Sequence, residues 1–145
     1  MFDRLNSRIA FALIVVASFA GGSSIVRAEM MTYTATLDGK SVVPPSMSAG
    51  TGQATLTYDS ATKELKWSVT YSGLSGPATA AHIHGPAEPG KNAGVLIPFG
   101  SAASPISGSK ILTDAQAADM MAGKWYVNVH TAANPGGEIR GNIQK

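Results

Sequence analysis

Residues 64–74 read ELKWSVTYSGL, and the alternation in this stretch decides the fold. Every second residue is apolar: Leu65, Trp67, Val69 and Tyr71. Successive side chains of a β-strand point to opposite faces of a sheet, so a period of two predicts a strand that buries one face. Two earlier stretches, MTYTATL (residues 31–37) and GQATLTYD (residues 52–59), carry the same alternation. They predict two further strands.

Four later segments continue the pattern, separated by stretches rich in Gly, Pro, Asn and Ser. They are residues 79–85, 94–100, 124–131 and 137–143. About seven short strands joined by such loops predict an all-β fold, either an antiparallel sandwich or a barrel. Two polar stretches of small residues, PPSMSAGTG (residues 44–52) and GSAASPISGS (residues 100–109), are expected to be flexible surface.

One short helix is predicted at about residues 114–122. Thr113 is placed to cap its first turn, and Gln116 follows three residues later, as in a capping box. Gly123 is placed to end the helix.

The first 28 residues have the features of a secretory signal peptide. Arg4 and Arg8 make a basic start, an apolar run of 12 residues follows at residues 9–20, and small residues precede Ala28. A bilayer-spanning helix needs about 20 apolar residues, so cleavage after Ala28 is favoured over retention as an anchor. The mature chain is then expected to be a single domain of residues 29–145 in the periplasm or outside the cell.

Removing the signal also removes the apparent basicity of the chain. The remaining residues include 8 Lys and Arg against 8 Asp and Glu. Nucleic acid is therefore not expected as a partner, nor is a membrane after signal cleavage, because either would require a basic patch. The chain has no cysteine, which excludes disulfides and thiolate metal ligands.

All three histidines of the chain lie in predicted strands. In AAHIH (residues 80–84), His82 and His84 fall on one face, about 7 Å apart along the backbone. In WYVNVHT (residues 125–131), His130 falls on the polar face. The imidazoles at positions 82 and 84 can therefore converge on one ion, with His130 as a third ligand.

Other polar residues are available to support such a site. Asn128 shares the polar face of its strand with His130. In the last segment Ile139 and Ile143 point inward, so Glu138 and Arg140 are expected on the outward face. Asn128, Glu138 and the carbonyls of the Gly/Pro loops can orient histidine rings by accepting a ring N–H.

The sequence resembles the CHRD domain, the module named after chordin and also found as stand-alone exported bacterial proteins. The resemblance rests on HIHGP, YVNVHT and PGGEIRG, in this order, and extends upstream to ATLDGKSVVPP. It implies a secreted, immunoglobulin-like antiparallel β-sandwich with Greek-key character. Val42 stands where the family often has Glu. The family is also similar in architecture to copper/zinc superoxide dismutases, where an H-x-H pair supplies copper ligands.

Two functions are consistent with these residues. The first is binding of a metal ion by His82, His84 and His130, with copper(II) preferred on affinity and zinc as the second choice. Ring nitrogens within about 4 Å of one another would favour it, since each ligand bond is about 2 Å. The second is a structural or protein-interaction domain, with an unidentified protein partner, in which the same residues only hydrogen-bond the loops.

An enzyme is not expected. A copper/zinc dismutase needs a bridging histidine and a zinc site in addition to its copper ligands, and this chain has three histidines. No nucleophile elbow precedes a predicted helix, and no serine lies beside a histidine in a recognised setting.

Overall fold

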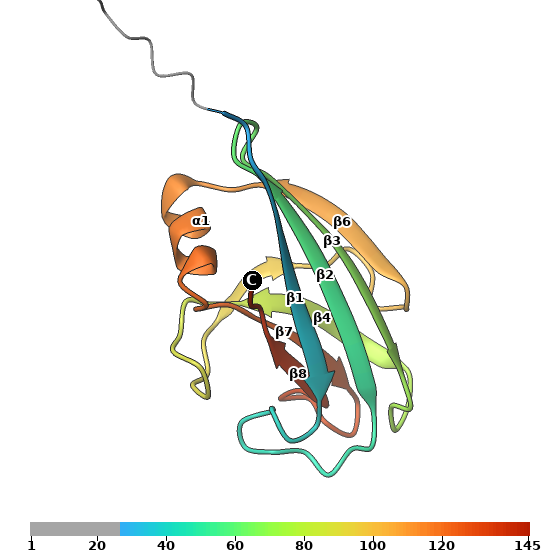
Figure 1. Cartoon of the computed structure of the whole chain (residues 1–145). Coiled ribbons are helices and arrows are strands. Elements are labelled where there is room, and N and C mark those ends of the chain that lie inside the picture. Colours follow the sequence, from blue (N-terminus) through green and yellow to red (C-terminus); the bar gives the residue numbers. More distant parts are fainter. Residues whose placement is uncertain (1–26) are drawn as a thin grey trace, which may run out of the picture.

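The computed structural model describes residues 27–145 and contains eight strands and one helix in that range (Figure 1). In chain order these elements are β1 (Met30–Asp38), β2 (Thr51–Asp59), β3 (Glu64–Ser72), β4 (Ala78–His84), β5 (Val95–Pro98), β6 (Ile106–Ile111), α1 (Asp114–Met121), β7 (Tyr126–Thr131) and β8 (Ile139–Asn142). The predicted signal peptide lies, except for its last two residues, outside the described range. Within that range no helix is long and apolar enough to cross a membrane.

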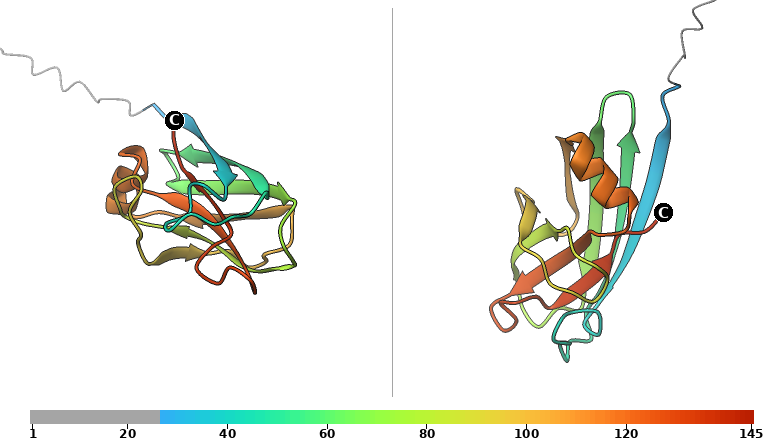
Figure 2. Two further views of the ribbon diagram at one scale, coloured as in Figure 1. Left: turned by 90° about the horizontal axis from the view of Figure 1, so that it is seen from below. Right: turned by 90° about the vertical axis from the view of Figure 1, so that its left-hand side faces the viewer.

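The strands form one continuous antiparallel sheet in the order β5-β4-β7-β8-β1-β2-β3-β6, which confirms the all-β prediction. The two layers of the predicted sandwich are the two halves of this curled sheet (Figure 2). They join where β8 and the residues after it meet β1, at the pairs Asp38–Arg140 and Thr34–Gln144. Trp67 of β3 stacks on Phe99, which follows β5, at 5.2 Å between ring centroids. The halves therefore face each other across one core.

The apolar positions of the alternating stretches are buried, as their period predicts. Tyr33, Ala35 and Leu37 of β1 lie in the core, and so do the corresponding residues of the next two strands except Tyr71, which is partly buried against the core. Trp67 and Trp125 are both buried there. Burial of this apolar surface is the main favourable term in folding a chain that has no disulfides.

The prediction of flexible surface at residues 100–109 is wrong in its second half. β6 begins at Ile106 and pairs with the edge of β3 over six residues. Only Ile106 of this strand is buried, so the segment lacks an apolar alternation. Gly108 lies opposite Trp67, and a β-carbon at Gly108 would come within 2.5 Å of the indole ring. β6 forms because β3 supplies a pairing edge and because Trp67 of β3 packs against Gly108.

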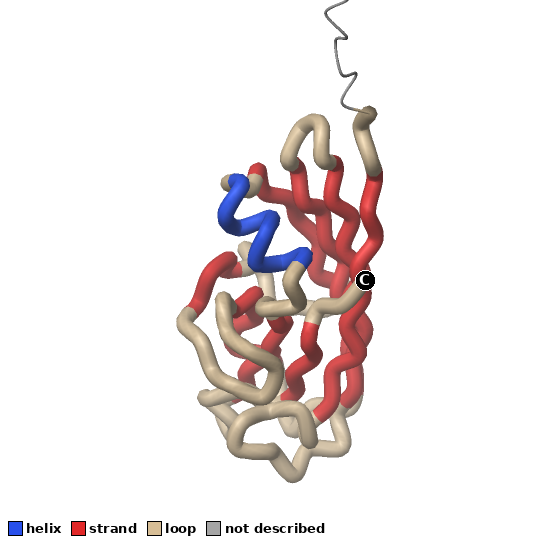
Figure 3. Tube along the Cα trace, turned by 60° about the vertical axis from the view of Figure 1, so that its left-hand side comes forward, coloured by secondary structure: helices blue, strands red, loops and turns tan. Residues whose placement is uncertain are grey.

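The helix lies beside the curled sheet, on the chain segment that connects β6 to β7 (Figure 3). The predicted capping box is present, since Thr113 Oγ1 accepts from the Gln116 amide and Gln116 Oε1 accepts from the Thr113 amide. The helix ends one residue earlier than predicted, followed by Gly123 at a φ of 73°. Met120 faces the core and Met121 faces solvent.

Replacing Thr113 by alanine is expected to lower the free energy of unfolding by about 1 kcal/mol, because the Gln116 amide loses its side-chain acceptor. Urea unfolding followed by circular dichroism measures this change. The variant Thr113→Ser keeps the hydroxyl and should stay within about 0.5 kcal/mol of wild type. An equal loss in both variants would contradict the capping role.

Strand β7 is buried on both faces, which the alternation alone does not indicate. The loops at residues 39–50 and 85–94 reach the face that points away from the core, where Ser46 donates to the Glu138 carbonyl and Asn92 accepts from Arg140. The expectation that Glu138 and Arg140 face outward is therefore wrong with respect to exposure. Their exposed fractions are 0% and 1%. Backbone alternation fixes which face a side chain takes, and the long loops decide whether that face meets water.

Candidate metal centre

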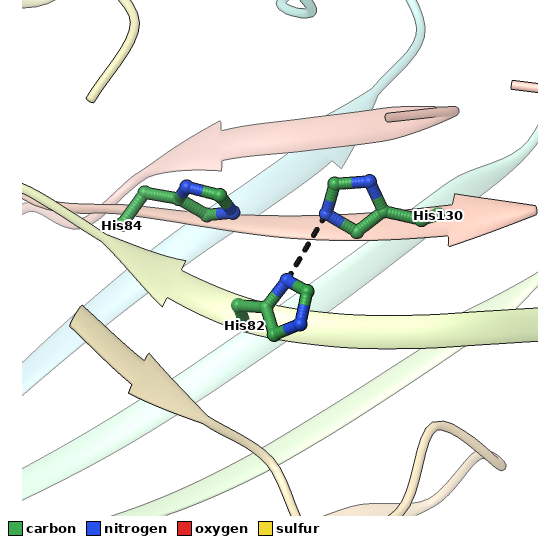
Figure 4. Close-up of side chains that lie close together, drawn as sticks. All are labelled: His82, His84 and His130. Atoms are coloured by element: carbon green, nitrogen blue, oxygen red, sulfur yellow. Dashed lines mark hydrogen bonds between the residues drawn. The ribbon is translucent and has the colours of Figure 1, made fainter. Parts of the chain in front are cut away.

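The three histidines predicted to form a site lie together in the structure (Figure 4). His82 and His84 come from β4 and His130 from its neighbour β7. Their ring centroids are 4.9 Å apart for His82 and His130, 5.4 Å for His82 and His84, and 5.8 Å for His84 and His130. The period of two in β4 and the pairing of β4 with β7 produce this cluster, because both strands turn the same face toward the loops.

One nitrogen from each ring can be chosen so that all three lie within 4.8 Å of one another. His82 Nδ1 and His130 Nε2 are 3.2 Å apart, within the limit of about 4 Å that one ion requires. The whole set is wider than that limit. The three nitrogens would have to approach one another by roughly 1 Å to bind one ion.

Two backbone carbonyls fix which nitrogens face the cluster. His84 Nδ1 lies 3.0 Å from the Ala93 carbonyl oxygen, and His130 Nδ1 lies 2.9 Å from that of Pro135. A carbonyl only accepts, so each Nδ1 carries the proton and each Nε2 carries a lone pair. Figure 4 shows the remaining nitrogen of His84 turned toward His130. His84 Nε2 is buried and has no hydrogen-bond partner among the described residues.

Burial favours the neutral, metal-binding form of His82 and His84. The exposed fractions of His84 and His130 are 7% and 9%, whereas His82 is partly exposed. Burial lowers the pKa of His82, and the neighbouring His130 and His84 lower it further. Burial also lowers the pKa of His84; the Ala93 carbonyl opposes this shift, while His130 and Arg140 add to it. Neutral imidazole is the form that binds zinc and copper.

The residues predicted to support the rings do so only indirectly. In the described chain, Asn128, Glu138 and Arg140 make no hydrogen bond to a histidine ring. Asn128 Nδ2 donates to the Gly136 carbonyl at 3.4 Å. The orienting groups are carbonyls of the Gly/Pro loops, which the sequence had suggested as a class.

Tyr126 is the neighbour of the site that the sequence analysis did not single out. Its ring stacks on His84 at 4.9 Å with an interplanar angle of 5°. Its hydroxyl donates to the Ala93 carbonyl at 3.1 Å and accepts from the Ala93 amide at 3.0 Å. Tyr126 thus holds the carbonyl that orients His84. Its place on the same polar strand face as His130 was the available signal.

Glu138 anchors the loops around the site without touching the rings. Its carboxylate accepts from the hydroxyls of Ser48, Ser75 and Thr131, from the Ser75 amide and from Asn134 Nδ2. Burial by itself raises the pKa of Glu138, but the hydrogen bonds from Thr131, Ser75 and Ser48 outweigh it and lower the pKa to about 2. The ionised carboxylate therefore joins three loops to β7.

The match of the sequence to a family model agrees with this architecture. Residues 33–143 match the model of the CHRD domain, and this range covers nearly all of the described chain. The chain belongs to the CHRD family. Neither the curated proteins nor the solved structures gave a significant match. CHRD domains are typically extracellular or exported, and they are not known as an enzyme family. All three histidines lie inside the matched range.

Proposed function

We propose that this CHRD protein is an exported, non-enzymatic metal-binding module that holds copper(II), with zinc as the second choice, at His82, His84 and His130. The observation that carries the proposal is the unpartnered, buried Nε2 of His84. A buried polar atom without a partner is unfavourable unless a ligand satisfies it. A metal ion satisfies it and also draws on the lone pair of His130 Nε2.

The donor set suits copper or zinc. It offers three neutral imidazole nitrogens, which copper(II) and zinc both accept, and copper(II) binds more tightly in the general order of divalent ions. The carbonyls of Ala93 and Pro135 would act as outer-shell partners that hold two of the rings. Because His82 is partly exposed, water or another small ligand would take a fourth position from that side.

A second candidate function is a structural or protein-interaction domain. The hydrogen bonds from His84 to Ala93 and from His130 to Pro135 favour it, because they tie two loops to the sheet without any ion. In that case the histidines stabilise the loop surface that a protein partner would contact.

Copper(II) titration of the purified protein, followed by calorimetry and electron paramagnetic resonance, separates the two candidates. We expect one equivalent to bind with nitrogen hyperfine structure. His84→Phe preserves the ring stacked on Tyr126 and removes the ligand nitrogen, so it should weaken binding by about 100-fold, as His84→Ala should.

Met47→Ala serves as the control for this titration. Met47 is 100% exposed, and its thioether is a soft donor available for adventitious binding. Removing it should leave the affinity unchanged. If wild type and His84→Phe bind copper equally, the metal proposal is wrong and the loop-stabilising role remains.

A further inference from the structure

Arg140 is a buried cation without an acidic partner among the described residues. Its Nη1 donates to Asn92 Oδ1 at 2.9 Å and its Nη2 donates to the Lys91 carbonyl at 2.8 Å. Both acceptors are neutral, and within residues 27–145 Nε has no hydrogen-bond partner. A buried charge is normally paired with an opposite one, so this arrangement needs a reason.

The guanidinium belongs to a stack that ends at the candidate metal site. Arg140 Cζ lies 3.5 Å from the centroid of the Tyr126 ring, and the His84 ring lies 4.9 Å from the same centroid in a nearly parallel plane. Strand β7, which carries Tyr126, runs between β4 and β8. The ring of Tyr126 is therefore covered by His84 on one side and by Arg140 on the other.

Glu138 is the buried charged residue two positions before Arg140, and it has different neighbours. Glu138 accepts five hydrogen bonds, which stabilise its carboxylate and leave its negative charge in place. None of these donors belongs to the stack. The side chain of Lys91 is exposed, so solvent screens it. Arg140 is the charged side chain that contacts this stack, since its guanidinium lies over the Tyr126 ring that stacks on His84.

From this stack we propose that Arg140 is a specificity-determining residue of the copper site and shifts its preference from copper(II) toward copper(I). The inference rests on the proposed copper binding. Three neutral imidazoles contribute no negative charge, so nothing in the ligand set offsets the repulsion between Arg140 and the ion. The repulsion grows with ion charge. At a separation of about 10 Å and an effective dielectric constant of about 20, one unit of charge changes the relative affinity by about tenfold.

The variant Asn92→Asp tests the inference with little change of shape. It places a carboxylate at the Oδ1 position that already accepts from Arg140, so the hydrogen bond is kept and the cation is neutralised. We expect the ratio of copper(II) affinity to copper(I) affinity to rise by about tenfold. Copper(II) affinity is measured by competition with nitrilotriacetate in air, and copper(I) affinity by competition with bicinchoninate under anaerobic ascorbate.

Two further variants separate charge from positioning. Asn92→Ala loses the bond to Arg140 and the bond from Nδ2 to the Val43 carbonyl. Asn92→Asp keeps the first bond, but at the second position it places a carboxylate oxygen that repels the Val43 carbonyl. Any displacement of the loop should lower the affinities for copper(II) and copper(I) equally and leave the ratio of the two affinities unchanged. Arg140→Lys keeps the charge but loses the planar stack and the two-pronged donor, so its ratio should also stay near that of wild type.

Each outcome decides one question. A rise in the ratio of copper(II) affinity to copper(I) affinity in Asn92→Asp that is absent from Asn92→Ala supports the inference, and a fall in this ratio overturns it. Equal changes in both affinities, or no change, overturn it and leave copper binding intact. Failure of the wild-type protein to bind either ion overturns the proposed function itself, and the wild-type titration alone reveals that failure.

Discussion

Replacing Glu138 by glutamine is expected to lower the free energy of unfolding at neutral pH by about 3 kcal/mol. The carboxylate is fully buried and accepts five hydrogen bonds, and bonds to a charged acceptor are stronger than bonds to a neutral one. Glutamine has nearly the same shape but presents an NH2 group where two hydroxyls and Asn134 Nδ2 now donate. Urea unfolding at pH 7 measures the loss.

The pH dependence of the same variant tests the role of the charge. Because folding lowers the pKa of Glu138 to about 2, its stabilisation is fully present above the ordinary glutamate pKa of about 4.3 and is lost as the pH falls toward 2. Glutamine does not titrate in this window. The difference in stability between wild type and Glu138→Gln should therefore shrink between pH 5 and pH 2, as unfolding at several pH values would show.

Glu88→Gln is the matched control. Glu88 is largely exposed and lies 3.8 Å from Lys124, so its removal should change stability by less than about 1 kcal/mol at any pH. A gap between wild type and Glu138→Gln that stays constant from pH 7 to pH 2 would contradict an ionised, hydrogen-bonded Glu138.

Replacing Gly141 by alanine is expected to destabilise the protein by about 3 kcal/mol, at the upper end of overpacking effects. A β-carbon at Gly141 would overlap the Thr36 carbonyl and crowd the Leu37 amide of β1. These are backbone atoms and cannot rotate away. β8 would have to move from β1 at the join between the two halves of the sheet. The melting temperature measured by calorimetry should fall by about 10 °C.

Gly136→Ala is the control for this substitution. No atom lies within 4 Å of the position that its β-carbon would take, and its φ is outside the left-handed region. It should melt within about 2 °C of wild type. If both alanine variants melt alike, the close approach of β1 to β8 is not what Gly141 provides.

Most strands follow from local pattern. In the residues around Trp67, alternation predicts both the strand and the buried face, because the pleat of the backbone imposes that period on any extended chain. The helix follows from Thr113 and Gln116, whose bonds span three residues. β6 does not follow, since its sequence has one buried residue and depends on the partner edge of β3.

The cluster of three histidines was partly predictable from the sequence. Period two places His82 and His84 on one face, but their distance from His130 depends on the pairing of β4 with β7. The paired residues His84 and Tyr126 are 42 positions apart in the chain. The orienting carbonyls of Ala93 and Pro135 belong to loops whose paths no periodicity encodes. Arg140 and Glu138 lie on the expected strand face, yet the loops bury them.

By itself the sequence determined seven of the eight strands described, the capped helix, the family and the three imidazole donors of a candidate site. These features depend on residue type and on spacings of two to four residues, because the local geometry of a strand or helix determines which residues at such spacings share a face. Only the tertiary structure decided which nitrogens face one another, that Tyr126 links Arg140 to His84, and that Glu138 and Arg140 are shielded from water. These depend on long-range strand pairing and on loops packed over the sheet, because side chains far apart in the chain acquire their environment only when the whole fold closes.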